Sequence, residues 1–132
     1  MDLRILEIAS NTVNHKVVKN HTHQSKNKNP LCGDEMEIRL IVKDNIIKDM
    51  GYQCRSCVYC QASVSMLSQK IKNKKLSEIK SLTSSVESLF KENEIKIDTK
   101  WISFTEIINK NNISRKECLL LPFKTISKAL KF

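Results

Sequence analysis

Apolar and polar residues alternate in one stretch near the middle of the chain. The apolar positions are Met36, Ile38, Leu40 and Val42, followed after Asp44 and Asn45 by Ile46, Ile47, Met50 and Tyr52. Alternation on both sides of two turn-forming residues is typical of a β-hairpin with one buried face. The sequence therefore predicts an antiparallel hairpin over about residues 36–54.

Helical spacing of apolar residues follows the hairpin. Cys60, Val64, Leu67 and Ile71 recur at intervals of four, three and four, which predicts a helix from about Val58 to Lys72. The same kind of stripe predicts a further helix over residues 76–90. A last helix is expected from about Leu119, with Pro122 tolerated in its first turn. Between these two, Trp101 and Phe104 are expected to seal an edge of the core, and Phe104, Ile107 and Ile108 suggest a short helix.

The first thirty residues divide into two parts. Apolar residues at mixed spacings between Leu3 and Val18 predict an N-terminal helix over residues 1–19. Residues 20–31 are almost entirely polar and predict an exposed loop that ends near Pro30. With no internal repeat visible in 132 residues, the whole chain 1–132 is expected to form one α+β domain, a small antiparallel sheet packed against several helices.

The charge adds little to this picture. The 23 basic residues exceed the 14 acidic ones, but most are lysines spread along the chain, which favours a diffusely solvated surface. Aromatic residues interleaved with Arg and Gly, as in RNA-binding motifs, are lacking, so we expect no nucleic-acid partner. No apolar stretch approaches the roughly 20 residues that span a bilayer, and no secretory signal is evident. We therefore expect a cytoplasmic protein without membrane contact.

Five cysteines make metal or sulfur chemistry the best expectation. An odd number of cysteines without a secretory signal argues against a disulfide framework. Cys32 lies between Pro30, which stiffens the chain, and Gly33, which can adopt backbone angles closed to other residues. This loop can present the Cys32 thiolate together with the Asp34 carboxylate, which could be a metal ligand, a hydrogen-bond acceptor or a surface charge.

Cys57 and Cys118 share an electrostatic setting. Each is expected just ahead of a helix, where exposed N–H groups and the helix dipole favour a thiolate over a thiol. Arg115 and Lys116 add positive charge beside Cys118. Both cysteines are therefore candidates for metal binding and for nucleophilic attack.

An alternative use of the cysteines remains open. Cys54, Cys57 and Cys60 form a Cys-x-x-Cys-x-x-Cys run, which can belong to a zinc knuckle or to part of a ferredoxin-like ligand set. With a histidine from the loop holding His21 and His23, it would form a structural zinc-binding or nucleic-acid-binding module. Cys60 lies on the apolar stripe, however, and is expected to be buried, whereas Cys54 is expected at an exposed strand end. His15, like the other two histidines, is expected to be solvated.

The chain resembles the IscU, SufU and NifU N-terminal-domain family of iron–sulfur cluster assembly scaffolds. The matching segments are Asn29–Asp34, Ile47–Asp49, Cys57 with Ala62–Ser65, and Arg115–Cys118 with Leu121. Glu117 and Arg115 resemble the SufU branch, as does the long separation between Cys57 and Cys118, which implies an insertion around residues 77–112. Ser56 replaces the family's usual glycine, and Cys54 and Cys60 are additions to its pattern.

The resemblance implies an α+β fold in which Cys32, Asp34, Cys57 and Cys118 converge as metal ligands. The three cysteines would hold zinc, iron or a transient [2Fe–2S] cluster. Cys118 and Cys32 are then candidate persulfide acceptors, supported by Arg115. The implied partners are a cysteine desulfurase and downstream apo-acceptor proteins or a cluster carrier. Two mechanisms fit this resemblance equally, a zinc-dependent sulfurtransferase and a non-enzymatic scaffold.

Overall fold

A three-stranded sheet and a set of helices make up the chain. The computed structural model describes residues 3–31, 33–90 and 97–132. The elements are α1 (Leu3–Ala9), β1 (His23–Lys28), β2 (Glu35–Lys43), β3 (Ile46–Arg55), α2 (Val58–Lys70), α3 (Leu76–Ser85), the 3-10 helices η1 (Val86–Phe90), η2 (Thr99–Glu106) and η3 (Lys110–Arg115), and α4 (Lys116–Leu130). This α+β composition confirms the predicted fold class.

The predicted hairpin is confirmed as strands β2 and β3. The strands pair antiparallel, and the inward pairs bring apolar residues together, as in Ile38 opposite Tyr52 and Leu40 opposite Met50. Asp44 and Asn45 both have positive φ angles, 54° and 61°. This geometry suits a tight hairpin turn, because it matches the right-handed twist of the flanking strands.

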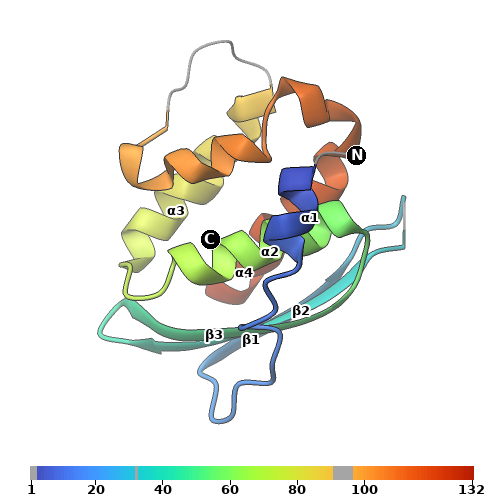
Figure 1. The fold of residues 1–132 in the computed structure, drawn as a ribbon. Helices are drawn as coiled ribbons and strands as arrows, with labels where there is room; N and C mark the ends of the chain where they lie inside the picture. The colour runs from blue at the N-terminus through green and yellow to red at the C-terminus, as the bar shows by residue number, and fades with distance from the viewer. Residues whose placement is uncertain (1–2, 32, 91–96) are drawn as a thin grey trace.

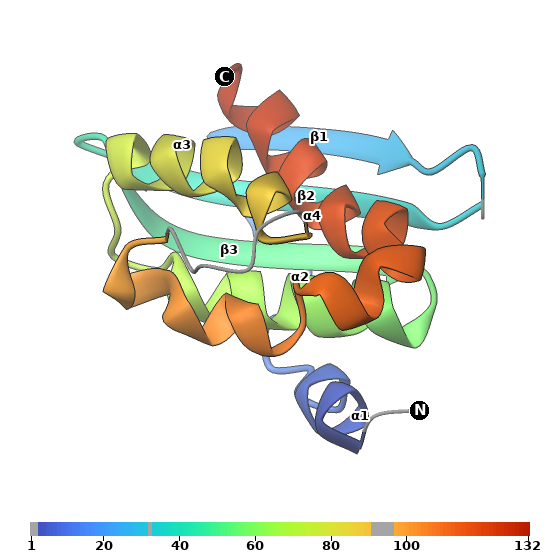
Figure 2. The same ribbon diagram turned by 90° about the horizontal axis from the view of Figure 1, so that it is seen from above.

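The helices lie in layers on one face of the sheet (Figure 1). Helices α2 and α4 contact the sheet directly, α1 packs against α2, and α3 packs against α4. Seen from above, α2 and α4 cross the sheet side by side (Figure 2). The buried apolar side chains form one cluster that runs from the inner face of the sheet through both helices to the outer layer. The sheet therefore serves as the floor on which α2 and α4 are positioned.

The prediction of an exposed loop over residues 20–31 was wrong for its central part. Residues His23–Lys28 form β1, an edge strand paired antiparallel with β2. The strand has no apolar alternation, and its one buried residue is a serine, Ser25, whose hydroxyl donates to the carbonyl of Thr125 at 2.6 Å. Pairing with β2 and this bond to α4 fix the strand, so apolar periodicity could not reveal it.

The predicted N-terminal helix is also shorter than expected. Helix α1 ends at Ala9, and the chain that follows passes along β3, where the N–H of Tyr52 donates to the carbonyl of Asn14 at 3.1 Å. The Asn14 amide donates to the hydroxyl of Ser68 at 3.0 Å. Val13 and Val17, two apolar residues of the expected helix, are 68% and 47% exposed. Hydrogen bonds to distant elements replace the helical ones over this segment.

Gly51 of β3 allows this N-terminal segment to pack closely. A Cβ atom at Gly51 would lie 2.5 Å from the carbonyl oxygen of Lys16 and 2.7 Å from Cγ2 of Val18. We therefore expect Gly51→Ala to lower the free energy of unfolding by about 1–3 kcal/mol, the typical cost of overpacking. Urea denaturation of this variant tests the prediction, with exposed Gln53→Ala as the control. Equal midpoints for Gly51→Ala and the wild type would contradict the close packing.

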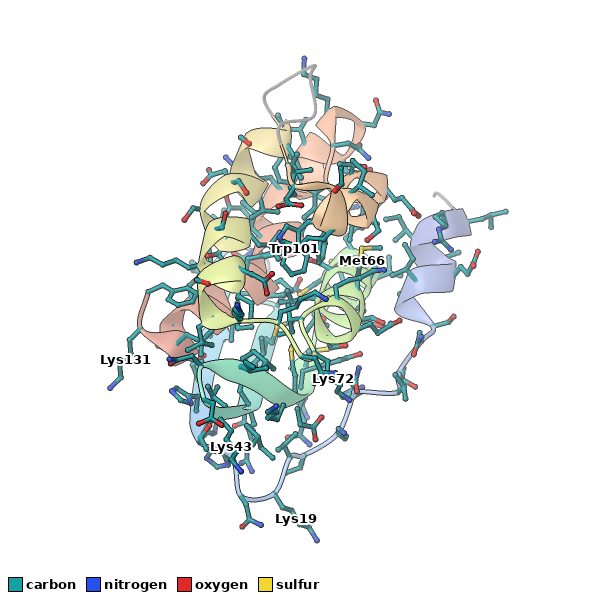
Figure 3. All side chains as sticks on the ribbon, turned by 90° about the vertical axis from the view of Figure 1, so that its left-hand side faces the viewer. Lys19, Lys43, Met66, Lys72, Trp101 and Lys131 are labelled. Atoms are coloured by element: carbon teal, nitrogen blue, oxygen red, sulfur yellow. The ribbon has the colours of Figure 1, made fainter. Side chains whose placement is uncertain are left out.

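Residues between α3 and α4 complete the core. Trp101 and Phe104 are buried as predicted, and the Phe104 ring meets the Phe123 ring edge-on at 5.5 Å. Trp101 points into the interior between the helices (Figure 3). The interpretation of residues 77–112 as an insertion stays a prediction, and residues 91–96 within it lie outside the described part of the chain.

Helix α4 begins earlier than predicted. It starts at Lys116, so Pro122 lies in its second turn rather than its first. Proline has no N–H to donate to the carbonyl four residues earlier, which here belongs to Cys118. Pro122 therefore leaves a gap in the helical hydrogen-bond ladder directly after the turn that holds this cysteine.

The lysines are distributed around the molecule. Lys19, Lys43 and Lys131 project from separate edges in Figure 3, and all three are exposed. Their separation agrees with a diffusely solvated charge. Within the described residues, no helix is both long enough and apolar enough to cross a membrane.

Candidate metal centre

The loop between β1 and β2 places Asp34 at the start of β2. The N–H of Asn29 donates to the carbonyl of Asp34, and the N–H of Gly33 donates to the carbonyl of Asn29, both at 2.8 Å. Gly33 has a φ of +77°, a left-handed conformation that glycine adopts without steric cost. This closed turn buries Asp34 to 7% exposure. The predicted role of Cys32, in the same loop, falls outside the described residues.

Cys57 occupies the N-cap of α2, as predicted. Its backbone is extended, with φ −70° and ψ 167°, and its carbonyl accepts the N–H of Gln61 at 3.0 Å. The N–H of Cys57 donates to Oδ1 of Asp34 at 3.3 Å. The helix start and the β1–β2 loop are thus joined directly at the cysteine.

Cys118 lies in the first turn of α4. The prediction placed it just ahead of the last helix, and the earlier start of α4 brings it inside by two residues. It remains near the N-terminal end of α4, which follows directly on η3. Its side chain is 7% exposed.

A hydrogen bond between α2 and α4 fixes the relative positions of the helix ends that carry Cys57 and Cys118. The hydroxyl of Ser63 on α2 donates to the carbonyl of Leu119 on α4 at 2.6 Å, and Ser63 is fully buried. The adjacent Ala62 is fully buried as well, and its small side chain suits close helix packing. The segment Ala62–Ser65 was one of those that carry the family resemblance, but the sequence predicted no role for Ser63. A serine on a buried helical position was the available signal.

Asp34, Cys57 and Cys118 come together in space. One ligand atom from each lies within 4.8 Å of the other two. The family resemblance implied this convergence for four ligands, of which these are the three that the structure describes. The three residues come from a loop, an N-cap and a first helical turn that are far apart in the sequence.

The unpaired oxygen of Asp34 fits a cation at this position. Its Oδ2 is buried and has no hydrogen-bond partner among the described atoms, whereas Oδ1 accepts the N–H of Cys57. A buried polar atom without a partner costs free energy, which a bound cation would offset. Two thiolates and a carboxylate suit zinc or iron better than magnesium or calcium, which prefer oxygen ligands.

Cys54 and Cys60 lie outside this group. Cys60 is fully buried, as predicted, and burial raises the pKa of its thiol far above the usual range. Cys54, which was expected to be exposed, is half-buried, and burial likewise raises its pKa. Neither sulfur belongs to the group of ligand atoms that lie within 4.8 Å of one another. Both residues therefore suit packing or accessory roles better than metal ligation.

The histidines do not join a cysteine cluster among the described residues. The group with metal-binding geometry contains Asp34 and Cys118 instead of a histidine. His15 stacks on Tyr52 at a ring distance of 5.1 Å, and Nδ1 of His23 lies 2.9 Å from the hydroxyl of Thr22. These positions give no support to the module built from the Cys54, Cys57 and Cys60 run.

Arg115 and Tyr59 connect the two helix ends beside the site. The Arg115 guanidinium lies over the Tyr59 ring, 5.1 Å from its centroid. Arg115 is the N-cap of α4, and Tyr59 lies in the first turn of α2. This cation–π contact joins the two helix ends that carry Cys57 and Cys118. Sequence reasoning selected Arg115 but missed Tyr59, for which spacing gave no signal.

Comparisons with known proteins agree with this geometry. The profile of the family described as NifU-like N terminal domain matches residues 2–112. The iron-sulfur cluster assembly scaffold protein IscU of Thermotoga maritima is 35% identical over 105 residues, 79% of this chain and 73% of that protein. The zinc-dependent sulfurtransferase SufU of Bacillus subtilis is 25% identical, covering 90% of each chain.

A solved structure shows the same fold. The N-terminal part of a NifU-like protein from Brucella abortus superimposes with a TM-score of 0.89 over 98% of this chain and 91% of the other, at 19% identity. The fold and the family match thus agree with the resemblance found in the sequence. The chain belongs to the NifU-like N-terminal domain family, and it is similar to the scaffold protein IscU and to the sulfurtransferase SufU.

Proposed function

We propose that this protein accepts sulfur from a cysteine desulfurase and holds iron, zinc or a nascent [2Fe–2S] cluster on Cys32, Asp34, Cys57 and Cys118. The observation that carries the proposal is the convergence of Asp34, Cys57 and Cys118 within 4.8 Å around an unpaired carboxylate oxygen. The likeness to a scaffold protein and to a zinc-dependent sulfurtransferase supports the same chemistry. Because this chemistry needs reduced thiols, we assign it to the cytoplasm.

The residues of the site have separate roles in this proposal. Cys57 and Cys118 supply the sulfur atoms that attack the outer sulfur of a persulfide presented by the desulfurase. Arg115 supplies positive charge beside Cys118. Asp34 is the exchangeable ligand, because a carboxylate binds zinc or iron less tightly than a thiolate does. A metal bound here would order the thiolates and set which of them is released for attack.

Sulfur would then be passed to an apo-acceptor protein or combined with iron. Zinc-dependent transfer and cluster assembly use the same ligands, since zinc accepts four tetrahedral ligands and a [2Fe–2S] cluster is commonly held by thiolates. The protein would be a sulfurtransferase in the first case and a non-enzymatic scaffold in the second. The two cases differ in whether iron and sulfide accumulate on the protein.

Anaerobic purification followed by metal and acid-labile sulfide analysis tests the proposal. We expect zinc or iron bound at up to one site per chain, and sulfur acquired only when a desulfurase and cysteine are added. Sulfide together with iron would favour the scaffold, and persulfide with zinc would favour the sulfurtransferase. Cys54→Ser serves as the control, because Cys54 lies outside the converging group. A wild-type protein that acquires neither metal nor sulfur would refute the proposal.

A further inference from the structure

Cys57 and Cys60 stand at the same helix end but in different environments. Cys57 is the half-buried N-cap of α2, and Cys60 lies three residues later in the first turn, fully buried. Side chains three positions apart on a helix are neighbours, with Cβ atoms about 5–6 Å apart. A disulfide needs a Cβ separation of about 4 Å. A small closing movement at the helix end would therefore join the two sulfurs.

The backbone allows this movement at Cys57 more readily than at Cys60. Cys57 has extended dihedral angles and precedes the first helical residue, so its side chain can reorient without breaking the helix. Cys60 is held inside the helix and the core. Of the two cysteines, Cys57 is therefore the one that can reorient, and it belongs to the proposed metal centre.

Burial gives Cys60 a restricted reactivity. With no exposed surface, it cannot meet a partner protein's persulfide directly. A sulfur carried on Cys57 is the group that it can reach.

Sulfur can arrive on Cys57 from Cys118. Their sulfur atoms belong to the group that lies within 4.8 Å, so a persulfide accepted at Cys118 can pass its outer sulfur to Cys57 by thiol exchange. Cys118 regains a thiol in this exchange and Cys57 gains a persulfide. The number of sulfur atoms and electrons is unchanged.

We propose, on the basis of the function proposed above, that Cys60 is a resolving thiol that attacks the persulfide on Cys57, releases sulfide at the centre and leaves a Cys57–Cys60 disulfide. The added cysteine in this family member would thus convert delivered sulfur into the sulfide that a cluster requires. A bound cluster needs sulfide, whereas a persulfide carries its outer sulfur in a more oxidised state.

The step balances without an external reductant. A bond forms between the sulfur of Cys60 and Sγ of Cys57, and the bond from that Sγ to the outer sulfur breaks. The electron pair of the broken bond leaves with the outer sulfur, which takes the proton of Cys60 and departs as hydrogen sulfide. The outer sulfur is reduced by two electrons, and the two cysteines are oxidised to a disulfide. A thiol reductant is needed afterwards to reopen the disulfide for another cycle.

A single-turnover experiment tests this role. A desulfurase is loaded with sulfur, freed of cysteine by gel filtration and mixed anaerobically with the metal-free, reduced protein. We expect the wild type to release sulfide and to gain a Cys57–Cys60 disulfide, both measured after rapid quenching. Cys60→Ala should keep its persulfide, because it lacks an adjacent thiol of high effective concentration. Its rate of sulfide release should be lower than that of the wild type by at least about tenfold. Cys54→Ser should behave as the wild type.

The outcomes separate the two proposals. A persulfide that stays on Cys60→Ala supports both the proposed function and the resolving role of Cys60. A Cys60→Ala protein that never acquires sulfur counts against the proposed function. In that event, hydrogen peroxide oxidises Cys57 of the metal-free protein to a sulfenic acid, which Cys60 should resolve to the same disulfide with loss of water. Absence of the Cys57–Cys60 disulfide in this second reaction overturns the inference. Sulfide release by Cys60→Ala at the wild-type rate, or its loss in Cys54→Ser, does so as well.

The substitution removes one buried sulfur atom from the core, so folding is checked for each variant. Circular dichroism and thermal melting of Cys60→Ala are compared with those of Cys60→Ser, which keeps a side chain of similar size but replaces the sulfur. Both folded variants should retain the persulfide. A difference between them in sulfide release would contradict a role for the thiol itself.

Discussion

Replacing Cys118 with alanine should abolish tight binding of zinc or iron. Cys118 is buried in the first turn of α4 and contributes one of the three ligand atoms that lie within 4.8 Å of one another. Without Cys118, the site offers only Asp34, Cys57 and the predicted further ligand Cys32. These are too few for the four-coordinate tetrahedral site that zinc prefers. Metal content after anaerobic dialysis measures the loss. Cys54→Ala, a substitution of the same size at a half-buried cysteine, is the matched control.

Loss of the metal should also lower the stability of the fold. The metal would join the β1–β2 loop to the N-terminal ends of α2 and α4, and a ligand that binds only the folded state stabilises it by mass action. This amounts to about 3 kcal/mol when the free ligand is at a hundred times its dissociation constant. Chelation should lower the melting temperature of the wild type and leave that of Cys118→Ala unchanged. A wild-type melting temperature that survives complete chelation would exclude a structural contribution from the metal.

Replacing Asp34 with alanine should slow the release of metal or cluster several-fold. Among thiolate ligands the carboxylate is the one that exchanges most readily, so its dissociation opens the site to water or to an acceptor. Without this route, cargo stays on the thiolates longer. Transfer rates from loaded wild type and from loaded Asp34→Ala to an apo-acceptor measure the effect.

A purely structural role for Asp34 gives a different result. Asp34→Ala would then lose the bond from the Cys57 N–H, at 3.3 Å, and about 1 kcal/mol of stability, with transfer rates unchanged. Glu35→Ala is the matched control, because Glu35 is the adjacent carboxylate, is half exposed and pairs with Lys28 at 3.5 Å. Equal transfer rates in all three proteins would leave Asp34 a structural role only.

The convergence at the candidate site could be predicted only in part from single residues. The helix-end position of Cys57 followed from the stripe that begins at Cys60, because apolar spacing reports which helical face is buried. The convergence of Asp34 with Cys57 and Cys118 was expected through family resemblance alone. No spacing rule brings together a loop, an N-cap and a distant helix. Tyr59 was missed because its contact with Arg115 exists only once α2 and α4 are packed together.

Elements whose buried residues recur periodically could be predicted from the amino-acid sequence alone. The β2–β3 hairpin, the apolar face of α2 and the buried ring of Phe104 all follow from such local patterns. Tertiary structure decided the elements that depend on partners far away in the chain. Strand β1 exists because polar residues pair with β2, and the segment after α1 is extended because Asn14 bonds to β3 and α2. Periodicity measures contact with the core, whereas hydrogen bonds between distant segments and the meeting of ligand atoms depend on the whole fold.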